Sequence, residues 1–287
     1  MEKVEQIAKL VSQMDKQLRN ELIAENDEKQ VKELWENTYI KKQVDKRKRN
    51  GTFTLSDHIR GMVYSMLTSG APWNRIEPHI DGDTGQIRLI DEIFYEYHVD
   101  ALLSADPVEL SDRVRAYKLG TPYIKKQMKA LIEVDIRKLL VLEKEYGSVD
   151  SFYKGLADKN DNLKTLVKKL SDAKSPHKFV QLGEALTAEY LKNVGYDVGK
   201  PDRHIRRILG CEYLGCSTRK TVPPFEAIDI IAAIAKELKI TAAEVDYIIW
   251  AYCANGYGEI CTKCKPQCHR CVAKDYCKRT QISDKDR

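Results

Sequence analysis

Four cysteines near the C-terminus have the spacing of ligands to a metal cluster. Cys261, Cys268, Cys271 and Cys277 follow one another as C-x6-C-x2-C-x5-C. Ligands at such short intervals can wrap a compact loop around an inorganic cluster, and the soft thiolate is the preferred partner of iron in iron–sulfur sites. The spacing therefore predicts an iron–sulfur cluster held by these four cysteines.

Two other uses of the cysteines compete with a cluster. With Cys264 included, the loop contains two CxxC pairs, Cys261-x2-Cys264 and Cys268-x2-Cys271. Paired CxxC units are typical of zinc sites. Only three residues separate these pairs, whereas about a dozen or more separate the pairs of a zinc ribbon. Disulfides require an oxidising compartment, but the N-terminal MEKVEQIAKL has charges where a signal peptide is apolar. We interpret Cys264 as a spare thiol, and three further cysteines as small buried apolar residues: Cys211, Cys216 and Cys253.

The stretch from Ser175 to Leu209 predicts two short helices joined by a turn. Ser175 and Pro176 are typical of a helix start. An apolar face at helical spacing follows and is interrupted at Gln181-Leu182-Gly183; its residues are Phe179, Leu182, Leu186, Tyr190 and Val194. Because the N-terminus of a helix presents unpaired N–H groups, the start of the second helix is a candidate anion site.

Asp202 opens the next predicted helix, within the segment Lys200-Pro201-Asp202-Arg203-His204. An aspartate before an amphipathic run is most often an N-cap, and taken alone Asp202 is interpreted in that way. A rigidly held carboxylate can also stabilise developing positive charge, and it can orient or deprotonate a water molecule.

Together these motifs resemble the helix-hairpin-helix DNA glycosylase superfamily, and in particular its endonuclease III-like members with a C-terminal [4Fe-4S] loop. The resemblance extends from about Phe53 to Cys277, with the cysteine loop as its strongest motif and the KPDRH segment as the next. It implies a [4Fe-4S] cluster on the four cysteines. It also implies an all-α, two-lobed fold with a helical barrel lobe and a cluster lobe.

The resemblance assigns the role of catalytic carboxylate to Asp202, which lies some twenty residues beyond the hairpin and some sixty before the cysteine loop. Breaking an N-glycosidic bond gives the sugar oxocarbenium character, which a fixed anion stabilises, and the target base must be flipped out of the duplex. The DNA contacts implied by the resemblance are Gln181, Leu182, Gly183, Ala185, Lys200, Arg203, His204 and Arg207.

Two positions of the hairpin depart from the pattern of the superfamily. Gln181 stands where the G-x-G turn has its first glycine. Ala185 stands where bifunctional members have the lysine that attacks the sugar as a Schiff-base nucleophile. The sequence therefore resembles the monofunctional branch, and Lys200 is the residue close enough in sequence to act as a substitute nucleophile.

The stretch from Phe53 to Ile76 is similar to an early barrel helix and the wedge loop that follows it. The match places the wedge at Thr68 to Ala71, including Ser69 and Gly70, with Tyr64 facing the base pocket. Trp73 could stack on a base, as aromatic side chains do in nucleic-acid complexes. The alternative for Tyr64 and Trp73 is an ordinary place in the hydrophobic core.

Helical periodicity dominates the rest of the chain, and period-2 alternation is scarce. We expect ten or more helices in four regions. Residues 1–56 form N-terminal helices that pack with the cluster lobe, and residues 57–173 form the barrel lobe. Residues 174–210 hold the hairpin and the catalytic segment, and residues 211–287 hold the C-terminal helices and the cluster loop.

Charge and hydropathy agree with a DNA-binding protein. The chain has 287 residues and a net charge of +5. The tail from Cys261 onward has eight Lys or Arg and three Asp residues, which suits a polyanion as well as a solvated end. No run of eighteen apolar residues could span a membrane. We expect a cytoplasmic, nucleoid-associated monomer that acts on double-stranded DNA.

The function expected from the resemblance is monofunctional excision of a damaged or mispaired base, which leaves an abasic site. KPDRH and the absent lysine are most similar to the methyladenine-type branch, which acts on alkylated purines; uracil, thymine, hypoxanthine and adenine mispairs remain open. One alternative is a non-catalytic iron–sulfur protein that binds DNA, and another is a zinc-bound helical interaction module.

Overall fold

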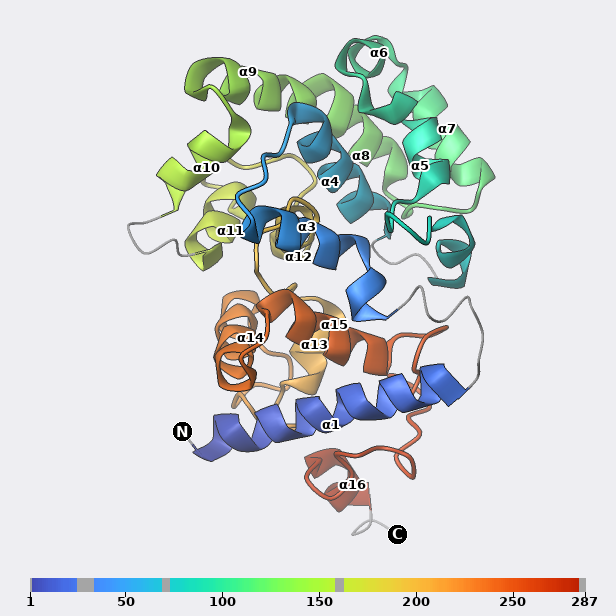
Figure 1. Cartoon of the computed structure of the whole chain (residues 1–287), viewed down its shortest axis with the longest axis vertical. Helices are drawn as coiled ribbons and strands as arrows, with labels where there is room; N and C mark the ends of the chain where they lie inside the picture. Colours follow the sequence, from blue (N-terminus) through green and yellow to red (C-terminus); the bar gives the residue numbers. More distant parts are fainter. Residues whose placement is uncertain (1, 25–33, 69–72, 158–162, 284–287) are drawn as a thin grey trace. The chain divides into compact units, whose positions relative to one another are not determined.

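The computed structural model describes residues 2–24, 34–68, 73–157 and 163–283. Within these ranges every regular element is a helix, apart from one isolated antiparallel bridge between Ile80 and Ile87 (Figure 1). The predicted all-α class is therefore confirmed. The chain divides into two compact units, which we name the terminal unit (residues 1–38 and 198–287) and the central unit (residues 39–197).

Helix α4 (Leu55–Thr68) supplies much of the core of the central unit, and α12 (Glu184–Asn193) packs along it. A Cβ atom on Gly61 would lie 3.0 Å from Cγ1 of Val194, so the missing side chain lets the two segments approach closely. The apolar residues of α4 recur at helical spacing as the sequence predicts. Five of them are completely buried: Ile59, Met62, Val63, Met66 and Leu67.

The other elements of the central unit are short. Helix α8 (Ile124–Ala130) continues through a π-helical turn, η5 (Leu131–Asp135), into α9 (Ile136–Tyr146). The remaining α-helices are α3 (Tyr39–Lys48), α5 (Arg88–Ile93), α6 (Val99–Ser104), α7 (Pro107–Ala116), α10 (Val149–Leu156) and α11 (Leu163–Ser171). The 3-10 turns are η2 (Trp73–Arg75), η3 (Glu77–His79) and η4 (Tyr95–Tyr97).

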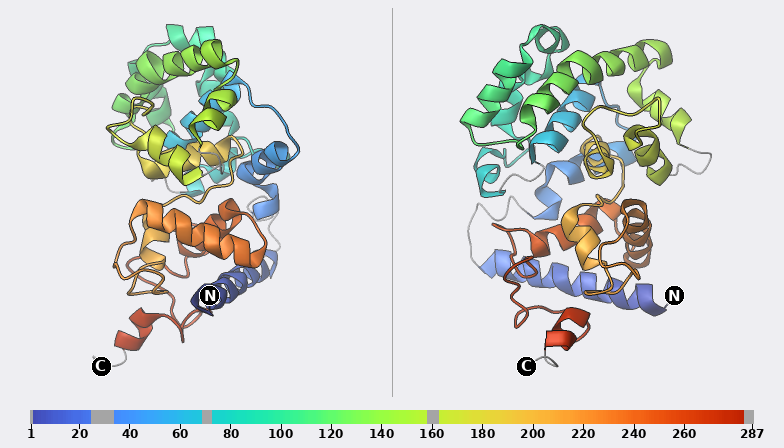
Figure 2. Two further views of the ribbon diagram at one scale, coloured as in Figure 1. Left: turned by 90° about the vertical axis from the view of Figure 1, so that its left-hand side faces the viewer. Right: turned by 180° about the vertical axis from the view of Figure 1, so that it is seen from behind.

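The terminal unit joins the two ends of the chain. Helix α1 (Glu2–Ala24), blue in Figures 1 and 2, lies beside α14 (Pro224–Leu238) and α15 (Ala242–Cys253). Each side chain that α1 buries against them contributes roughly 1.5–3 kcal/mol; these include Ile7, Val11, Met14 and Leu18. The remaining elements are η1 (Trp35–Asn37), α13 (Arg203–Ile208) and α16 (Lys278–Ser283).

The unit boundaries differ from the regions expected from sequence. The chain enters the central unit at residue 39 and leaves it after residue 197, whereas the sequence suggested divisions after residues 56 and 173. Helix α3 therefore belongs to the central unit, and it packs against α12. The hairpin also belongs to the central unit, whereas Asp202 belongs to the terminal unit.

Among the residues described, none of the helices combines the length and the apolar character that a membrane span requires.

Candidate functional site

Asp202 is the N-cap of α13. Its backbone is extended (φ −79°, ψ 178°), and its Oδ1 atom accepts hydrogen bonds from the backbone N–H groups of His204 at 2.8 Å and Ile205 at 3.0 Å. These bonds fix the direction of the half-buried carboxylate. Both go to one oxygen, and no described residue hydrogen-bonds Oδ2. The cap therefore holds the carboxylate rigid and leaves one of its oxygens for another partner.

Basic residues flank Asp202 in the sequence. Arg203 is exposed, whereas Lys200 and His204 are half-buried. Burial lowers the pKa of the His204 imidazole, and the cationic side chains of Arg203, Arg207 and Lys200 reinforce the shift against the opposing effect of Asp202. The backbone N–H of Lys200 donates to Oδ2 of Asp246, 3.1 Å away, which fixes the entry to α13. An anionic ligand would meet a positive potential at the start of this helix.

Arg207 links α13 to the cysteine loop. Its Nη2 donates to the carbonyl of Cys261 at 2.6 Å, and its Nη1 lies 3.9 Å from the Cys261 sulfur. The guanidinium also stacks on the ring of Tyr213, 5.0 Å from the centroid. The structure thus places Arg207, a predicted DNA contact, against the loop, and Arg203 is the more exposed arginine of the helix.

The four predicted cluster ligands line one pocket. Cys261, Cys268, Cys271 and Cys277 surround it together with Tyr213 and five others, namely Ile260, Pro266, Lys274, Arg279 and Thr280. Cys264 is exposed and does not line it. Four cysteines of one short loop thus border a single space, and the thiol is the donor type that iron–sulfur clusters use.

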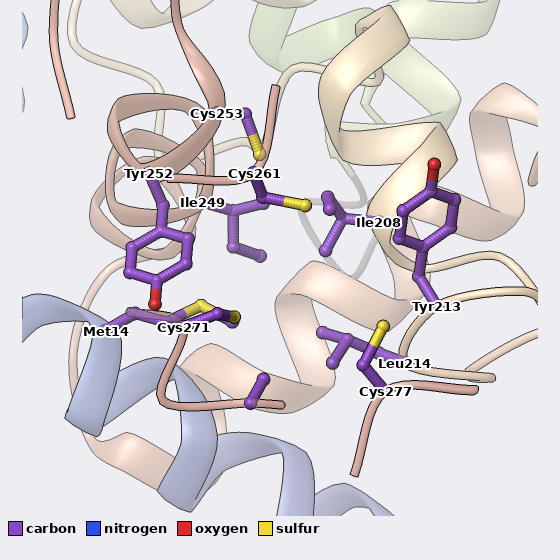
Figure 3. A pocket seen from close by; sticks show the side chains of 11 residues that line it. Met14, Ile208, Tyr213, Leu214, Ile249, Tyr252, Cys253, Cys261, Cys271 and Cys277 are labelled. Atoms are coloured by element: carbon purple, nitrogen blue, oxygen red, sulfur yellow. The ribbon is translucent and has the colours of Figure 1, made fainter. Parts of the chain in front are cut away.

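A second pocket adjoins the first and shares three of these cysteines. Figure 3 shows Cys253 here with Cys261, Cys271 and Cys277, and with the rings of Tyr213 and Tyr252. Cys253 is the last residue of α15 and is buried, as the sequence suggested for it. Its contact with Cys261 could not be predicted from the cysteine spacing, because Cys253 lies outside that motif.

The surroundings of Cys261, Cys271 and Cys277 shift the pKa values of their thiols in different directions. A hydrogen bond with Cys253 lowers the pKa of the Cys261 thiol to about 7 against the effect of burial, and Arg207 reinforces that shift. Burial raises the pKa of Cys271 and of Cys277. Within the described part of the chain, no three His, Cys, Asp or Glu side chains are arranged to hold a single metal ion.

The hairpin turn has the backbone of its expected motif but not the residue. Gln181 lies in the left-handed region at φ +62°, the conformation that glycine adopts most readily. Leu182 is buried, and Gly183 is the exposed N-cap of α12, with ordinary backbone angles (φ −84°, ψ −178°). A Cβ atom on Gly183 would meet nothing within 4 Å. Neither its conformation nor internal packing requires glycine there, so the open space suits the close approach of a ligand.

The first N–H groups of α12 are the candidate anion donors of this hairpin. Thr187 N–H is the first to bond back, to the carbonyl of Gly183, so the amides of Glu184, Ala185 and Leu186 precede the helical ladder. Ala185 is half-buried in this first turn and carries no amine.

Of the residues predicted for the base pocket and wedge, the structure describes Tyr64 and Trp73. Tyr64 is buried; its hydroxyl donates to Asp91 at 2.8 Å and accepts from the N–H of Ile87 at 2.7 Å. Its polar end is thus held within the central unit. Trp73 is half-buried in η2. The wedge residues Ser69 and Gly70 lie outside the described residues.

Comparisons with known proteins bear on this site. No protein-family model matches the chain. The chain is similar to the 8-oxoguanine DNA glycosylase/AP lyase of Aquifex aeolicus (strain VF5), with 33% identity over 100 residues, which are 34% of this chain and 44% of that relative. The match thus covers less than half of the relative's length. It supports a relationship with the DNA glycosylases and does not bear on the [4Fe-4S] loop.

Two solved structures from Methanocaldococcus jannaschii also match. The 8-oxoguanine glycosylase/lyase in complex with 15mer DNA containing 8-oxoguanine is 18% identical, with a TM-score of 0.48 over 83% of this chain and 96% of that chain. The 8-oxoguanine DNA glycosylase is 20% identical, with a TM-score of 0.49 over 85% of this chain and 92% of that chain. Both likenesses are too weak to carry a conclusion about activity.

Proposed function

We propose that this protein is a DNA glycosylase that excises a damaged purine, with 8-oxoguanine as the first substrate to test. The geometry of Asp202 carries the proposal, because its carboxylate is fixed by two N–H bonds to one oxygen while the other oxygen has no described partner. The Aquifex relative, named as an 8-oxoguanine DNA glycosylase/AP lyase, supports the same class of enzyme. No comparison supports the methyladenine-type substrate expected from the sequence.

Asp202 would act on the sugar of the flipped nucleotide. As the N-glycosidic bond breaks, positive charge develops on the sugar ring, and a fixed carboxylate stabilises it without having to reorganise. The Oδ2 atom is also able to orient or deprotonate the attacking water. Because both N–H bonds hold Oδ1, the orientation of Oδ2 is set before the substrate binds.

The hairpin would hold the DNA backbone. The amides of Glu184, Ala185 and Leu186 lie at the positive end of the α12 dipole, and Gly183 leaves room for a phosphate to approach them. Glu184 opposes this attraction, since its carboxylate lies in the same first turn. We infer that the protein acts as a monomer on double-stranded DNA.

Cys261, Cys268, Cys271 and Cys277 would hold a [4Fe-4S] cluster. When bound, such a group supplies electron-transfer capacity and cross-links the loop. Arg207 donates to the Cys261 carbonyl and belongs to the helix that Asp202 caps, so the order of the loop and of α13 depends on shared contacts. Excision itself requires only the carboxylate, a water molecule and the flipped base.

The test is excision from duplexes that each carry one lesion: 8-oxoguanine, 3-methyladenine, hypoxanthine or uracil. Asp202→Asn keeps the shape and hydrogen bonds of the cap but removes the charge, so excision should fall by at least about a hundredfold while DNA binding survives. Asp106→Asn is the matched control, because Asp106 caps α7 by accepting the N–H of Val108 at 2.8 Å. Full excision by the Asp202 variant would remove this residue from catalysis.

The product should be an intact abasic site, because Ala185 offers no amine where a lyase has its lysine. We expect strand cleavage only after alkali treatment, and no covalent adduct after borohydride, since trapping requires a Schiff base. The lyase activity in the name of the Aquifex relative makes this a demanding test. A trapped adduct that disappears in Lys200→Ala would identify Lys200 as the nucleophile and overturn the monofunctional assignment.

A non-catalytic DNA-binding protein is the second candidate, and the hairpin favours it. Gln181 replaces a glycine in a left-handed position, and Glu184 adds a negative charge beside the phosphate site. This alternative predicts DNA binding with no excision of any of the four lesions, and an Asp202→Asn variant that is indistinguishable from the parent protein.

A further inference from the structure

Asp135 is a buried carboxylate beside the hairpin that the proposed reaction does not use. It ends the π-helical turn η5 and is completely buried. Its Oδ1 accepts the backbone N–H of Val180 at 2.9 Å, and its Oδ2 has no hydrogen-bond partner among the described residues. A buried polar atom without a partner costs stability, so its retention requires a reason. π-helical turns also occur frequently at functional sites.

The Val180 N–H directly precedes the left-handed residue of the hairpin turn. The next residue, Gln181, adopts the left-handed backbone (φ +62°), and Gly183 then begins α12. A left-handed non-glycine residue is unfavourable by itself and persists where its surroundings hold it. Asp135 supplies one such restraint, immediately before the strained residue.

Two lysines hold the carbonyl groups of the same segment. Lys138, one turn after Asp135, donates from Nζ to the carbonyls of Pro176 and Lys178, each at 3.0 Å. Lys178 donates to the carbonyls of Ser171 at 2.7 Å and Leu182 at 3.2 Å. The turn is therefore held by charged side chains, with the carboxylate on the N–H side and the ammonium groups on the carbonyl side.

We propose that Asp135 is a positioning residue for the hairpin, and that its negatively charged form holds the turn in the geometry that binds a DNA phosphate. This inference rests on the proposed function for its connection to DNA. Charge matters because an N–H bond to a carboxylate is roughly twice as strong as a bond to a neutral acceptor. When Asp135 is neutral, the turn is held less firmly and the binding geometry is less populated, which weakens the apparent affinity.

The charge of Asp135 changes near neutral pH. Burial raises the pKa of its carboxyl to about 7, while the Val180 N–H, Lys138 and Lys178 oppose the shift. Tyr153 on α10 interacts with Asp135, and His177 on the hairpin segment interacts with Lys138 and with Lys169 of α11. Burial lowers the pKa of the His177 imidazole, and burial raises that of the Tyr153 hydroxyl, so Tyr153 stays neutral in this range.

The test compares the parent protein with Asp135→Asn, which keeps an oxygen able to accept the Val180 N–H but does not titrate. Binding of an undamaged duplex is measured by fluorescence anisotropy from pH 6 to pH 8.5. We expect the parent protein to bind about fivefold more tightly than the variant at high pH and equally at pH 6. Two matched controls should keep the parent's profile: Asp172→Asn, whose Oδ1 accepts the Lys174 N–H, and His177→Gln.

A ratio of affinities that stays constant across this range would overturn the proposal. Amide exchange at Val180 in the parent protein is the second measurement, and it requires neither the variant nor DNA. Protection, corrected for intrinsic exchange, should rise as pH increases through 7, and unchanged protection would equally contradict the proposal. If the parent protein bound no DNA, the proposed function would fail while exchange at Val180 still decided the role of Asp135.

Discussion

At the scale of single residues, two aspartates in the two units have contrasting surroundings. Asp202 caps α13 by accepting two N–H bonds on one oxygen, whereas Asp135 is completely buried and accepts one N–H bond. Burial raises the pKa of Asp135 to about 7. Because burial raises this pKa above the ordinary value of an aspartate, the contribution of Asp135 to the free energy of unfolding falls as pH rises from that ordinary value through 7. The Val180 N–H opposes the shift, so while Asp135 stays buried its charged form still strengthens that one bond and the turn that it holds. The strain at Gln181 is a further residue-scale cost.

Gln181→Gly should relieve that strain. The left-handed backbone costs a glutamine about 1–2 kcal/mol, and part of the gain is offset by the greater freedom of glycine in the unfolded chain. We expect the free energy of unfolding to rise by up to about 1 kcal/mol, measured by urea denaturation. Val180→Gly, one residue earlier where no left-handed backbone occurs, should lower it. A loss of stability in Gln181→Gly would show that the glutamine side chain itself holds the turn.

At the scale of elements, strong local patterns could be predicted from the sequence and tertiary contacts could not. The periodicity of α4 predicts its buried face because Ile59 and Met66 lie on one stripe, two turns apart. The Asp202 cap is visible for a similar local reason. The π-helical turn before α9 has no comparable signal, since it shifts Asp135 toward a segment some forty residues away. The contact between Arg207 and Cys261 likewise arises only when α13 packs against the cysteine loop.

The cysteine loop gives the prediction that belongs to this scale. Protein purified without air should be brown, with about four irons and four sulfides per chain. Cys268→Ala should lose the colour, because Cys268 lines the shared pocket with the other three ligands. Cys264→Ala is the matched control within the same loop and should keep the colour, because Cys264 is exposed outside the pocket. Stoichiometric zinc in place of iron, measured by elemental analysis, would contradict the assignment.

At the scale of the whole molecule, the chain crosses between its two units twice. Residues 1–38 and 198–287 fold together, and the hairpin is carried by the unit between them. The turn proposed to bind phosphate and the candidate carboxylate therefore belong to different units, and each can be perturbed by itself. An amphipathic helix such as α1 shows from sequence that it needs a partner, but not that the partner is α14 and α15, more than 200 residues later.

The dependence of DNA binding on salt should report contacts from both units together. Each phosphate contact contributes a slope of about −0.9 to a plot of log affinity against log salt, and we expect roughly four to eight contacts. Arg203→Gln should reduce the slope by about one contact, because Arg203 is exposed at the start of α13. Arg207→Gln should leave the slope unchanged, since that guanidinium donates to the Cys261 carbonyl, although the variant should unfold more readily.

Lys9→Gln on α1, where Lys9 pairs with Glu5, serves as the control for general loss of charge. If Arg207→Gln reduced the slope and Arg203→Gln did not, the phosphate contact would belong to the arginine that now holds the loop, and binding DNA would require α13 to release Cys261.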